Sequence, residues 1–346
     1  MDTSTSQDHG AHSADHPMLP QYHYILYGTM FSLEFVLGTG LNVLVLVYFL
    51  TKREASNSRF LYLCINSVDI TICGLSFLSA VTAFKGGSAA LLQHPIVCTC
   101  HGMLWNIAPR LSIFLIAVLS ISRTLSLIYP LRKMRKIQIA APVVVYTLLQ
   151  ALQSTIPFWF GKRYKFSDIH LICGWALNDI EMNQIVASFL YLLFTTVQFV
   201  LPAVPIVLSC CLSCYQLRNS NSTIKNSETK CRKRQATITI LFLTAAYIFF
   251  NLPVWVYTIT KNVIVFRGDW EMELSYEQDV LLQNLLTTHT VIVNSIVNAV
   301  VYLVRLTGLR SFVCRIMRGM CVWGRCGKSD NVKRLTHQLT HQVTMG

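Results

Sequence analysis

The stretch LSIFLIAVLSISRTLSLIY, residues 111–129, carries a single charged side chain, Arg123. It forms the second half of a longer apolar run over residues 95–129. A helix needs about 20 consecutive apolar residues to cross the hydrocarbon core of a bilayer. The run therefore predicts a membrane-spanning helix, and the place of Arg123 near its end leaves the charge within reach of water.

Apolar runs of this length recur along the chain. We count seven of them, at about residues 24–50, 60–84, 95–129, 137–160, 184–217, 236–265 and 280–306. The chain is 53% hydrophobic and 13% charged, whereas a soluble domain carries about 25% charged residues. A transmembrane β-barrel would show segments of about 10 residues with alternating hydrophobicity. The sequence therefore predicts an all-α membrane protein, a bundle of seven transmembrane helices.

The segments outside the runs complete the domain organisation. The first 21 residues lack the basic start and apolar middle of a signal peptide, so we expect the first helix to act as its own insertion signal. We expect a disordered extracellular N-terminus over 1–23, the seven-transmembrane bundle over 24–306, an amphipathic helix over 307–321 and a cytoplasmic tail over 322–346.

Basic residues divide unevenly between the two sides of the predicted bundle. Of the 29 Lys and Arg residues, 21 follow the first, third, fifth and seventh runs. The positive-inside rule then places the N-terminus outside the cell and the C-terminus in the cytosol, which indicates a multi-pass plasma-membrane protein. The net charge of +13 is explained by this topology signal and by attraction to anionic lipids of the inner leaflet. We expect membrane lipids and no nucleic acid among the partners.

Three cysteines, Cys98, Cys100 and Cys173, fall on the predicted outer side. An oxidising exterior permits one disulfide among them, which would tie the second outer loop to the third helix. Cys98–Cys173 is our preferred pairing, and Cys100 remains an alternative partner. Three more cysteines follow the seventh run in the basic amphipathic stretch GLRSFVCRIMRGMCVWGRC, and these are candidates for palmitoylation: Cys314, Cys321 and Cys326.

A few polar residues interrupt the apolar runs, and such residues are expected to be functional. Asp69 needs polar neighbours in a membrane, and Asn294, Ser295 and Asn298 could supply them from one side of the seventh helix. A carboxylate surrounded by hydroxyl and amide oxygens is a site for a hard cation. We expect either an allosteric sodium ion, as the only cofactor, or a purely structural polar network.

Arg110 lies halfway along the third run, beside a proline. It is too far from either interface to extend its charge into water. Its candidate partners are Glu34, Asp69 or an anionic group of a ligand. We therefore place Arg110 in a ligand pocket, with a buried ion pair as the alternative.

These features together resemble the rhodopsin-like (class A) G-protein-coupled receptors over about residues 24–321. The stretches that carry the resemblance are GTGLNVLVL in the first run, LCINSVDI in the second, SRTLSLIYPL in the third, FVLP in the fifth, FFNLP in the sixth and NSIVNAVVY in the seventh. Cys98 stands twenty-five residues before Arg123, which is the family's spacing for the bridged cysteine. Ser112 falls where the family has a serine of its sodium site.

The resemblance implies the residues that switch the receptor and couple it to a G protein. They are Arg123, Asn251, Pro253, Asn298 and Tyr302. Several positions depart from the family pattern. Ser122 replaces the acid before the arginine and Thr124 the tyrosine after it, while Asn251 stands where a tryptophan is usual. Because no acid precedes Arg123, we expect a loosely held resting state with raised basal signalling.

The resemblance also narrows the class of ligand. Trp105 stands where amine receptors carry an aspartate, and Ile292 stands where opsins carry the retinal lysine. A peptide or a small chemosensory molecule remains, and the acids at 269–279 favour a basic or amidated peptide. The expected pocket residues are Trp105, Asn106, Arg110, Trp255, Tyr257, Asn284 and Thr288.

We therefore expect a receptor that passes the signal of an extracellular ligand, preferably a peptide, to a heterotrimeric G protein. No nucleophile–base pair or phosphate loop is found in any cytosolic segment, so an enzyme is not expected. The alternatives are a chemosensory small-molecule receptor of the same fold and a seven-helix protein that does not couple to G proteins. A transporter or channel would show an internal repeat, and none is found.

Overall fold

The computed structural model describes residues 21–52, 57–85, 92, 94–129, 135–155, 158, 164–167, 171–174, 184–219, 227–267, 282 and 284–325. The predicted N-terminal segment lies almost wholly outside these residues, as do Cys326 and most of the predicted tail.

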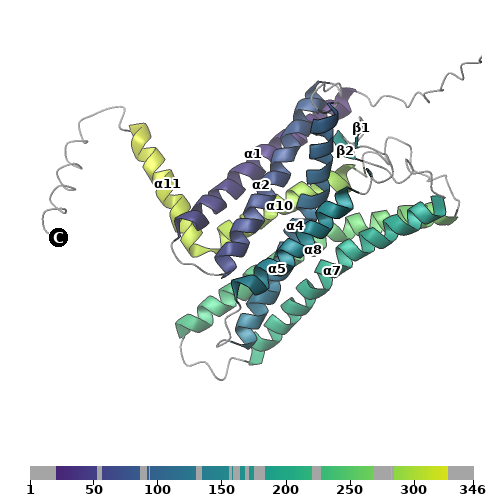
Figure 1. The fold of residues 1–346 in the computed structure, drawn as a ribbon. Helices are drawn as coiled ribbons and strands as arrows, with labels where there is room; N and C mark the ends of the chain where they lie inside the picture. Colours follow the sequence, from purple (N-terminus) through teal and green to yellow (C-terminus); the bar gives the residue numbers. More distant parts are fainter. Residues whose placement is uncertain are drawn as a thin grey trace, which may run out of the picture.

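Long helices make up the bundle (Figure 1). Their bounds are α1 Gln21–Thr51, α2 Asn57–Phe84, α4 Pro95–Ile128, α5 Lys136–Ser154, α7 Gln184–Asn219, α8 Ser227–Arg267 and α10 Thr290–Arg305. A π-helical turn, Leu285–His289, leads directly into α10. Each helix falls on one of the seven predicted apolar runs, and the predicted fold class is confirmed.

Hydropathy and length agree with this arrangement. Within the described residues, five helices are long and apolar enough to cross a membrane: α1, α2, α4, α5 and α8. A sixth candidate is the pair formed by α10 and the helix that follows it, α11 Thr307–Arg325, which meet at 92°. The sharp bend separates a spanning helix from the amphipathic helix expected after the seventh run. Figure 1 shows α11 leaving the bundle at this bend.

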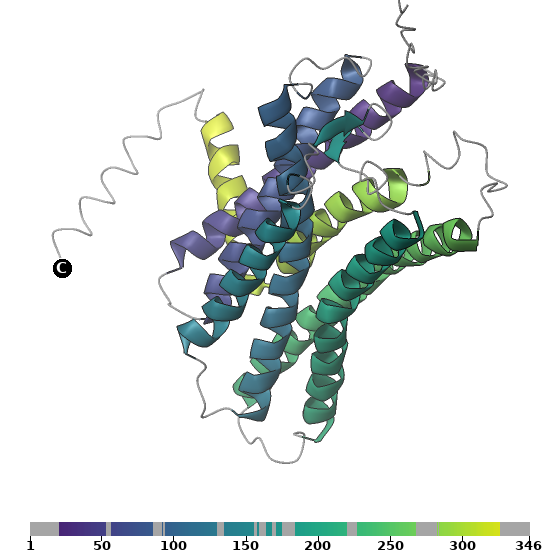
Figure 2. The same ribbon diagram turned by 45° about the vertical axis from the view of Figure 1, so that its right-hand side comes forward.

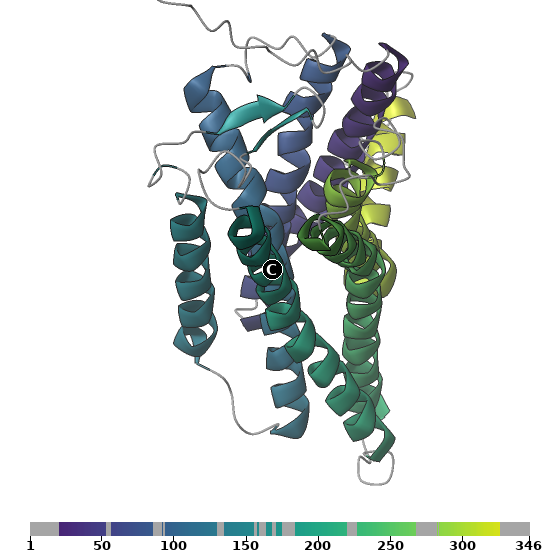
Figure 3. The ribbon, with the colours of Figure 1, turned by 90° about the vertical axis from the view of Figure 1, so that its right-hand side faces the viewer.

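Helices that are neighbours in sequence pack side by side. Figure 2 shows α7 and α8 running together, and Figure 3 shows α5 on the flank of the bundle beside α4. The first two helices approach closely at Gly38, where a Cβ atom would collide with the sulfur of Cys73. A glycine is needed here because only a bare backbone leaves room for the neighbouring side chain.

An apolar core fills the half of the bundle nearest to α11. Leu61, Leu115, Leu119, Tyr247 and Tyr302 are all fully buried in it. Lipid-facing side chains such as Val144, Leu148 and Leu149 of α5 are exposed instead. This is the distribution expected for a helix bundle whose outer surface is solvated by lipid tails rather than by water.

The two ends of the bundle differ. The hairpin end carries the start of α1 and a two-stranded antiparallel sheet, β1 Lys165–Ser167 and β2 Ile172–Gly174. The α11 end carries the connection between α10 and α11. There, Arg59 of α2 donates hydrogen bonds to the carbonyls of Phe49 (2.8 Å) and Leu50 (3.2 Å) in the last turn of α1. The last carbonyls of an α-helix lack partners within the helix, so the guanidinium caps the helix end.

Candidate functional site

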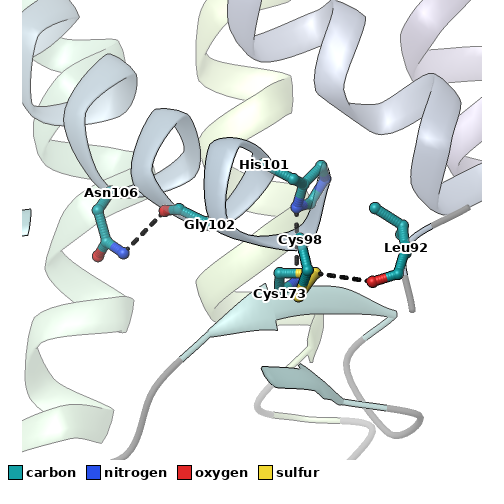
Figure 4. The surroundings of a disulfide bond; sticks show 6 residues. All are labelled: Leu92, Cys98, His101, Gly102, Asn106 and Cys173. Carbon is teal, nitrogen blue, oxygen red and sulfur yellow. Dashed lines mark hydrogen bonds between the residues drawn. A yellow bond between two sulfur atoms is a disulfide. The ribbon is translucent and has the colours of Figure 1, made fainter. Parts of the chain in front are cut away.

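The hairpin is attached to the start of α4 by a disulfide between Cys98 and Cys173 (Figure 4), whose Cα atoms lie 5.3 Å apart. The predicted pairing is confirmed, and Cys100 is a free, exposed cysteine. The backbone N–H of Cys173 also donates to Nδ1 of the buried His101, at 3.4 Å. A Cβ atom at Gly102 would collide with Tyr164 and the Cys173 carbonyl. The absence of a side chain at Gly102 thus lets the hairpin lie directly on α4.

A chain of hydrogen bonds runs from the hairpin end to the middle of the bundle. The hydroxyl of Tyr164 donates to the Ser154 carbonyl (3.0 Å), and Asn106 Nδ2 donates to the Tyr164 oxygen (3.4 Å) and the Gly102 carbonyl (2.9 Å). The Asn106 amide oxygen accepts a bond from Arg110 at 3.4 Å. The chain therefore links α5, the residue before β1, and α4.

Arg110 is half-buried, and it also donates a hydrogen bond to Oε1 of Gln150 on α5, at 3.2 Å. Asp69 and Glu34, the two acids considered as partners from the sequence, bond to other side chains. Gln150 is buried on α5, and its amide oxygen compensates part of the cost of holding a guanidinium away from water. Gln150 was not predicted from the sequence, because its contact with Arg110 depends on how α4 and α5 pack against each other.

The remaining predicted pocket residues lie on three helices. Trp105 of α4 is half-buried and stacks on His101 with ring centroids 6.0 Å apart. Trp255 and Tyr257 of α8 are half-buried, whereas Asn284 and Thr288 at the start of the seventh span are fully buried. All of these positions are in the halves of their helices nearest to the hairpin.

A buried acid–imidazole pair joins α1 to the seventh span. Nδ1 of His289 lies 2.9 Å and 3.0 Å from the two carboxylate oxygens of Glu34. Phe31 and Tyr27 of α1 pack against the imidazole, with ring centroids 4.6 Å and 5.9 Å away. From the sequence, Glu34 was considered only as a partner of Arg110, and His289 was not singled out. An ionisable residue inside the apolar run TTHTVIV was the signal that should have identified it.

Asp69 is completely buried and receives hydrogen bonds from two other helices. Ser112 of α4 donates at 2.6 Å, and Asn298 Nδ2 of α10 donates at 3.1 Å. Nearby, Asn42 Nδ2 of α1 donates to the carbonyls of Gly38 (2.9 Å) and of Ser295 (3.3 Å). The two sets of bonds connect α1, α2, α4 and α10 at the middle of the bundle.

Several oxygen atoms around Asp69 accept no hydrogen bond within the described part of the chain. The amide oxygens of Asn42, Asn294 and Asn298 are buried and have no hydrogen-bond partner within the described part of the chain. The Ser295 hydroxyl interacts with the Asp69 carboxylate and lies 3.4 Å from the Val291 carbonyl, to which it makes a weak intrahelical bond. Buried oxygens of this kind suit a hard cation, which accepts lone pairs without donating hydrogen.

The α11 end of α4 holds Arg123, which is half-buried. No ion pair of Arg123 is found among the described residues. Thr124, the residue after Arg123, joins α4 to α7. The hydroxyl of Thr124 lies 2.8 Å from that of Ser213 and 3.0 Å from the Ser209 carbonyl, both on α7.

The other predicted switch residues lie on α8 and α10. Tyr302 is fully buried and meets Tyr62 edge-on, with ring centroids 5.1 Å apart. Asn251 donates to the Tyr247 carbonyl one turn earlier, at 2.9 Å. Pro253 lies within α8 and faces outward. Among the acylation candidates, Cys314 is exposed on α11, the side chain of Cys321 is not among those described, and Cys326 lies outside the described residues.

The helical bundle, its disulfide-attached hairpin and the polar cluster around Asp69 define a seven-helix membrane receptor. The chain belongs to the rhodopsin family of seven-transmembrane receptors, whose family model matches residues 41–302. Members of this family are receptors rather than enzymes, and they are multi-pass proteins of the plasma membrane.

Two curated relatives are both described as G-protein coupled receptor 183. The human protein is 21% identical over 293 residues, which cover 83% of this chain and 80% of the relative. The bovine protein is 21% identical over 325 residues, which cover 92% of this chain and 89% of the relative. The match extends over nearly the whole bundle, so the family relationship concerns the complete fold.

Proposed function

We propose that the protein transmits the binding of an extracellular peptide to a heterotrimeric G protein. The observation that carries this proposal is the place of Arg123, half-buried at the α11 end beside the hydroxyl contact between α4 and α7. In the proposed step the helices around this cation separate and the G protein meets it there. Arg123, Asn298 and Tyr302 are the residues that would change contacts in this step, together with Asn251 and Pro253 of α8.

The orientation in the membrane is part of the proposal. A disulfide persists in an oxidising compartment, and the Cys98–Cys173 bond lies at the hairpin end together with the start of α1. The basic segments follow the opposite ends of the helices. Both features support an extracellular N-terminus and a cytosolic α11.

The proposed ligand site is the hairpin-side half of the bundle. Trp105, Asn106 and Arg110 would contact the ligand from α4, Trp255 and Tyr257 from α8, and Asn284 and Thr288 from the seventh span. The aromatic rings offer apolar contact area, and the Arg110 chain offers hydrogen-bond donors. The ligand is taken to be a basic or amidated peptide because of the acids at 269–279.

The decisive experiment measures G-protein nucleotide exchange in cells that display the receptor. A panel of amidated basic peptides is compared with a panel of small apolar molecules, so that the two ligand classes are distinguished. Arg123→Ala should abolish the response at normal surface level, and Lys85→Ala, at the hairpin-side end of α2, should leave it intact. A parent receptor at the surface that activates no G protein with either panel would contradict the coupling.

We also propose an allosteric sodium site at Asp69, with Ser112, Asn294 and Ser295 as further ligands. Support comes from the buried carboxylate and from the amide oxygens around it that lack donors. Sodium should raise the unfolding temperature of the purified receptor relative to potassium at equal ionic strength. An equal response to the two ions would refute the site.

The proposed contact of α11 with the inner leaflet rests on its composition. Arg310, Arg315 and Arg318 are exposed on this helix together with Cys314 and Met317. We propose that Cys314, Cys321 and Cys326 are palmitoylated, which would add acyl chains beside the basic side chains. Thioester-specific labelling of the parent and of the triple serine variant tests this modification.

A further inference from the structure

The seventh span changes its helix type near the hairpin end. Leu285–His289 form a π-helical turn, in which the Thr290 N–H bonds to the Leu285 carbonyl five residues back. The Leu286 carbonyl would accept that N–H in an α-helix, and it accepts the side-chain hydroxyl of Thr290 instead. A π-turn is rare and is maintained only where surrounding contacts stabilise it. The threonine at 290 is one such contact, because it satisfies the displaced carbonyl.

The last residue of the turn makes the second contact. His289 bonds through Nδ1 to both carboxylate oxygens of Glu34, and the side chains are only 2% and 8% exposed. Phe31 and Tyr27 lie against the imidazole ring. Removing one member of a buried acid–imidazole pair leaves the other without its partner, which is strongly unfavourable away from water. The pair therefore fixes His289, and with it the end of the π-turn, against α1.

The turn decides which side chains of the preceding residues face the bundle. An α-helix advances about 100° per residue, so one inserted residue rotates everything before it by about that angle. In the observed register Asn284 is 3% exposed and Leu285 is 44% exposed. If the π-turn relaxed into an α-helix, Asn284 would move about 100° around the helix axis and leave its buried position.

We propose that Glu34 and His289 are positioning residues that hold the π-turn and thereby keep Asn284 turned into the bundle. The inference rests on the proposed function in one respect, because Asn284 matters to signalling only if the hairpin-side half binds the ligand. The register itself is a property of the receptor without ligand or G protein. It is therefore measured separately from signalling.

The experiment follows the reactivity of a cysteine introduced at position 284. Asn284→Cys is placed in a Cys100→Ser background, which removes the exposed cysteine at the hairpin end, and intact cells are treated with a charged methanethiosulfonate. The reaction should be slow in this parent. It should become about tenfold faster with Glu34→Leu or His289→Phe, which corresponds to about 1.4 kcal/mol of lost restraint on the turn.

The matched control is His23→Phe. His23 is also a buried histidine packed near Tyr27, but neither of its ring nitrogens has a hydrogen-bond partner within the described residues. This control should leave the rate unchanged. Equal acceleration by the control, or unchanged rates with both test variants, would overturn the proposal.

A milder variant covers the case in which Glu34→Leu does not reach the surface. Glu34→Gln keeps an oxygen acceptor for His289 and removes the charge, and it should accelerate the reaction about threefold if it forfeits about half of the restraint. An unchanged rate with Glu34→Gln at normal surface level would overturn the proposal as well.

Discussion

Replacing Thr124 by valine removes the hydroxyl that joins α4 to α7 and keeps the shape of the side chain. In the native protein this hydroxyl lies 2.8 Å from Ser213 Oγ and within 3.0 Å of the carbonyls of Ser120 and Ser209. Thr124 is 3% exposed and Ser213 is fully buried. A hydroxyl has one hydrogen to donate, so Thr124 donates to one of these three neighbours, and when it donates to a carbonyl Ser213 donates to Thr124.

The expected magnitude follows from this geometry. Side-chain hydrogen bonds between membrane helices contribute about 0.6 kcal/mol on average and about 1.7 kcal/mol at most. Thr124 and Ser213 are buried and close, so their coupling should lie within this range. Bonds between helices at the α11 end oppose their separation, and separation is what the proposed coupling to a G protein requires. Loss of the bond should therefore raise the ratio of active to resting receptor about threefold to about eighteenfold.

The assay is basal nucleotide exchange by G protein, normalised to the number of receptors at the surface. Thr124→Val, Ser213→Ala and the double variant form a double-mutant cycle, which isolates the energy of the pair. Ser126→Ala is the control, because within the described residues the Ser126 hydroxyl bonds to the Arg123 carbonyl of its own helix and to no other helix. If both single variants leave basal exchange at the level of the parent, the contact does not restrain the resting state and the reasoning is wrong.

Further outcomes test other parts of the molecule. Cys98→Ser should destabilise the hairpin by about 2–5 kcal/mol and lower the surface level of the receptor, whereas Cys100→Ser should leave it unchanged; equal losses would contradict the assignment of the bridge. Asp69→Asn should remove the difference between sodium and potassium in the unfolding temperature, and a difference that survives would exclude Asp69 as a ligand. Arg59→Ala should lower the free energy of unfolding by about 1 kcal/mol, since it uncaps the end of α1; steric-trapping measurements in detergent micelles would check this, and an unchanged stability would show that water replaces the cap.

Much of the fold could be predicted from local information. Each of the seven apolar runs is long enough to satisfy all its backbone hydrogen bonds within one helix, which is the main requirement of a lipid environment. The spacing between Cys98 and Arg123, taken with the family pattern, was sufficient to select the correct disulfide over the pairing with Cys100. Length, hydropathy and spacing along the chain are properties of the sequence itself.

The polar contacts were predicted only in part. Asp69 was expected to need polar neighbours, and the structure places Ser112 and Asn298 against it. The expected partners of Arg110 were acids, whereas Gln150 and Asn106 bond to it. Which partners Arg110 has depends on which side of α5 packs against α4. The hydrophobicity of a run does not show which of its sides meets a given neighbour.

By itself the sequence determined the class of protein and the approximate positions of its helices, and with the family pattern it favoured the correct disulfide, because each of these inferences uses hydropathy or spacing along one chain. Only the tertiary structure decided the pairing of Glu34 with His289 and the hydroxyl contact of Thr124 with α7. The same is true of the π-turn, whose last residue is His289. These contacts join residues on different helices, separated by 255 positions in the case of Glu34 and His289. Their existence depends on how each helix is rotated in the bundle, and that rotation is set by packing with every neighbour at once.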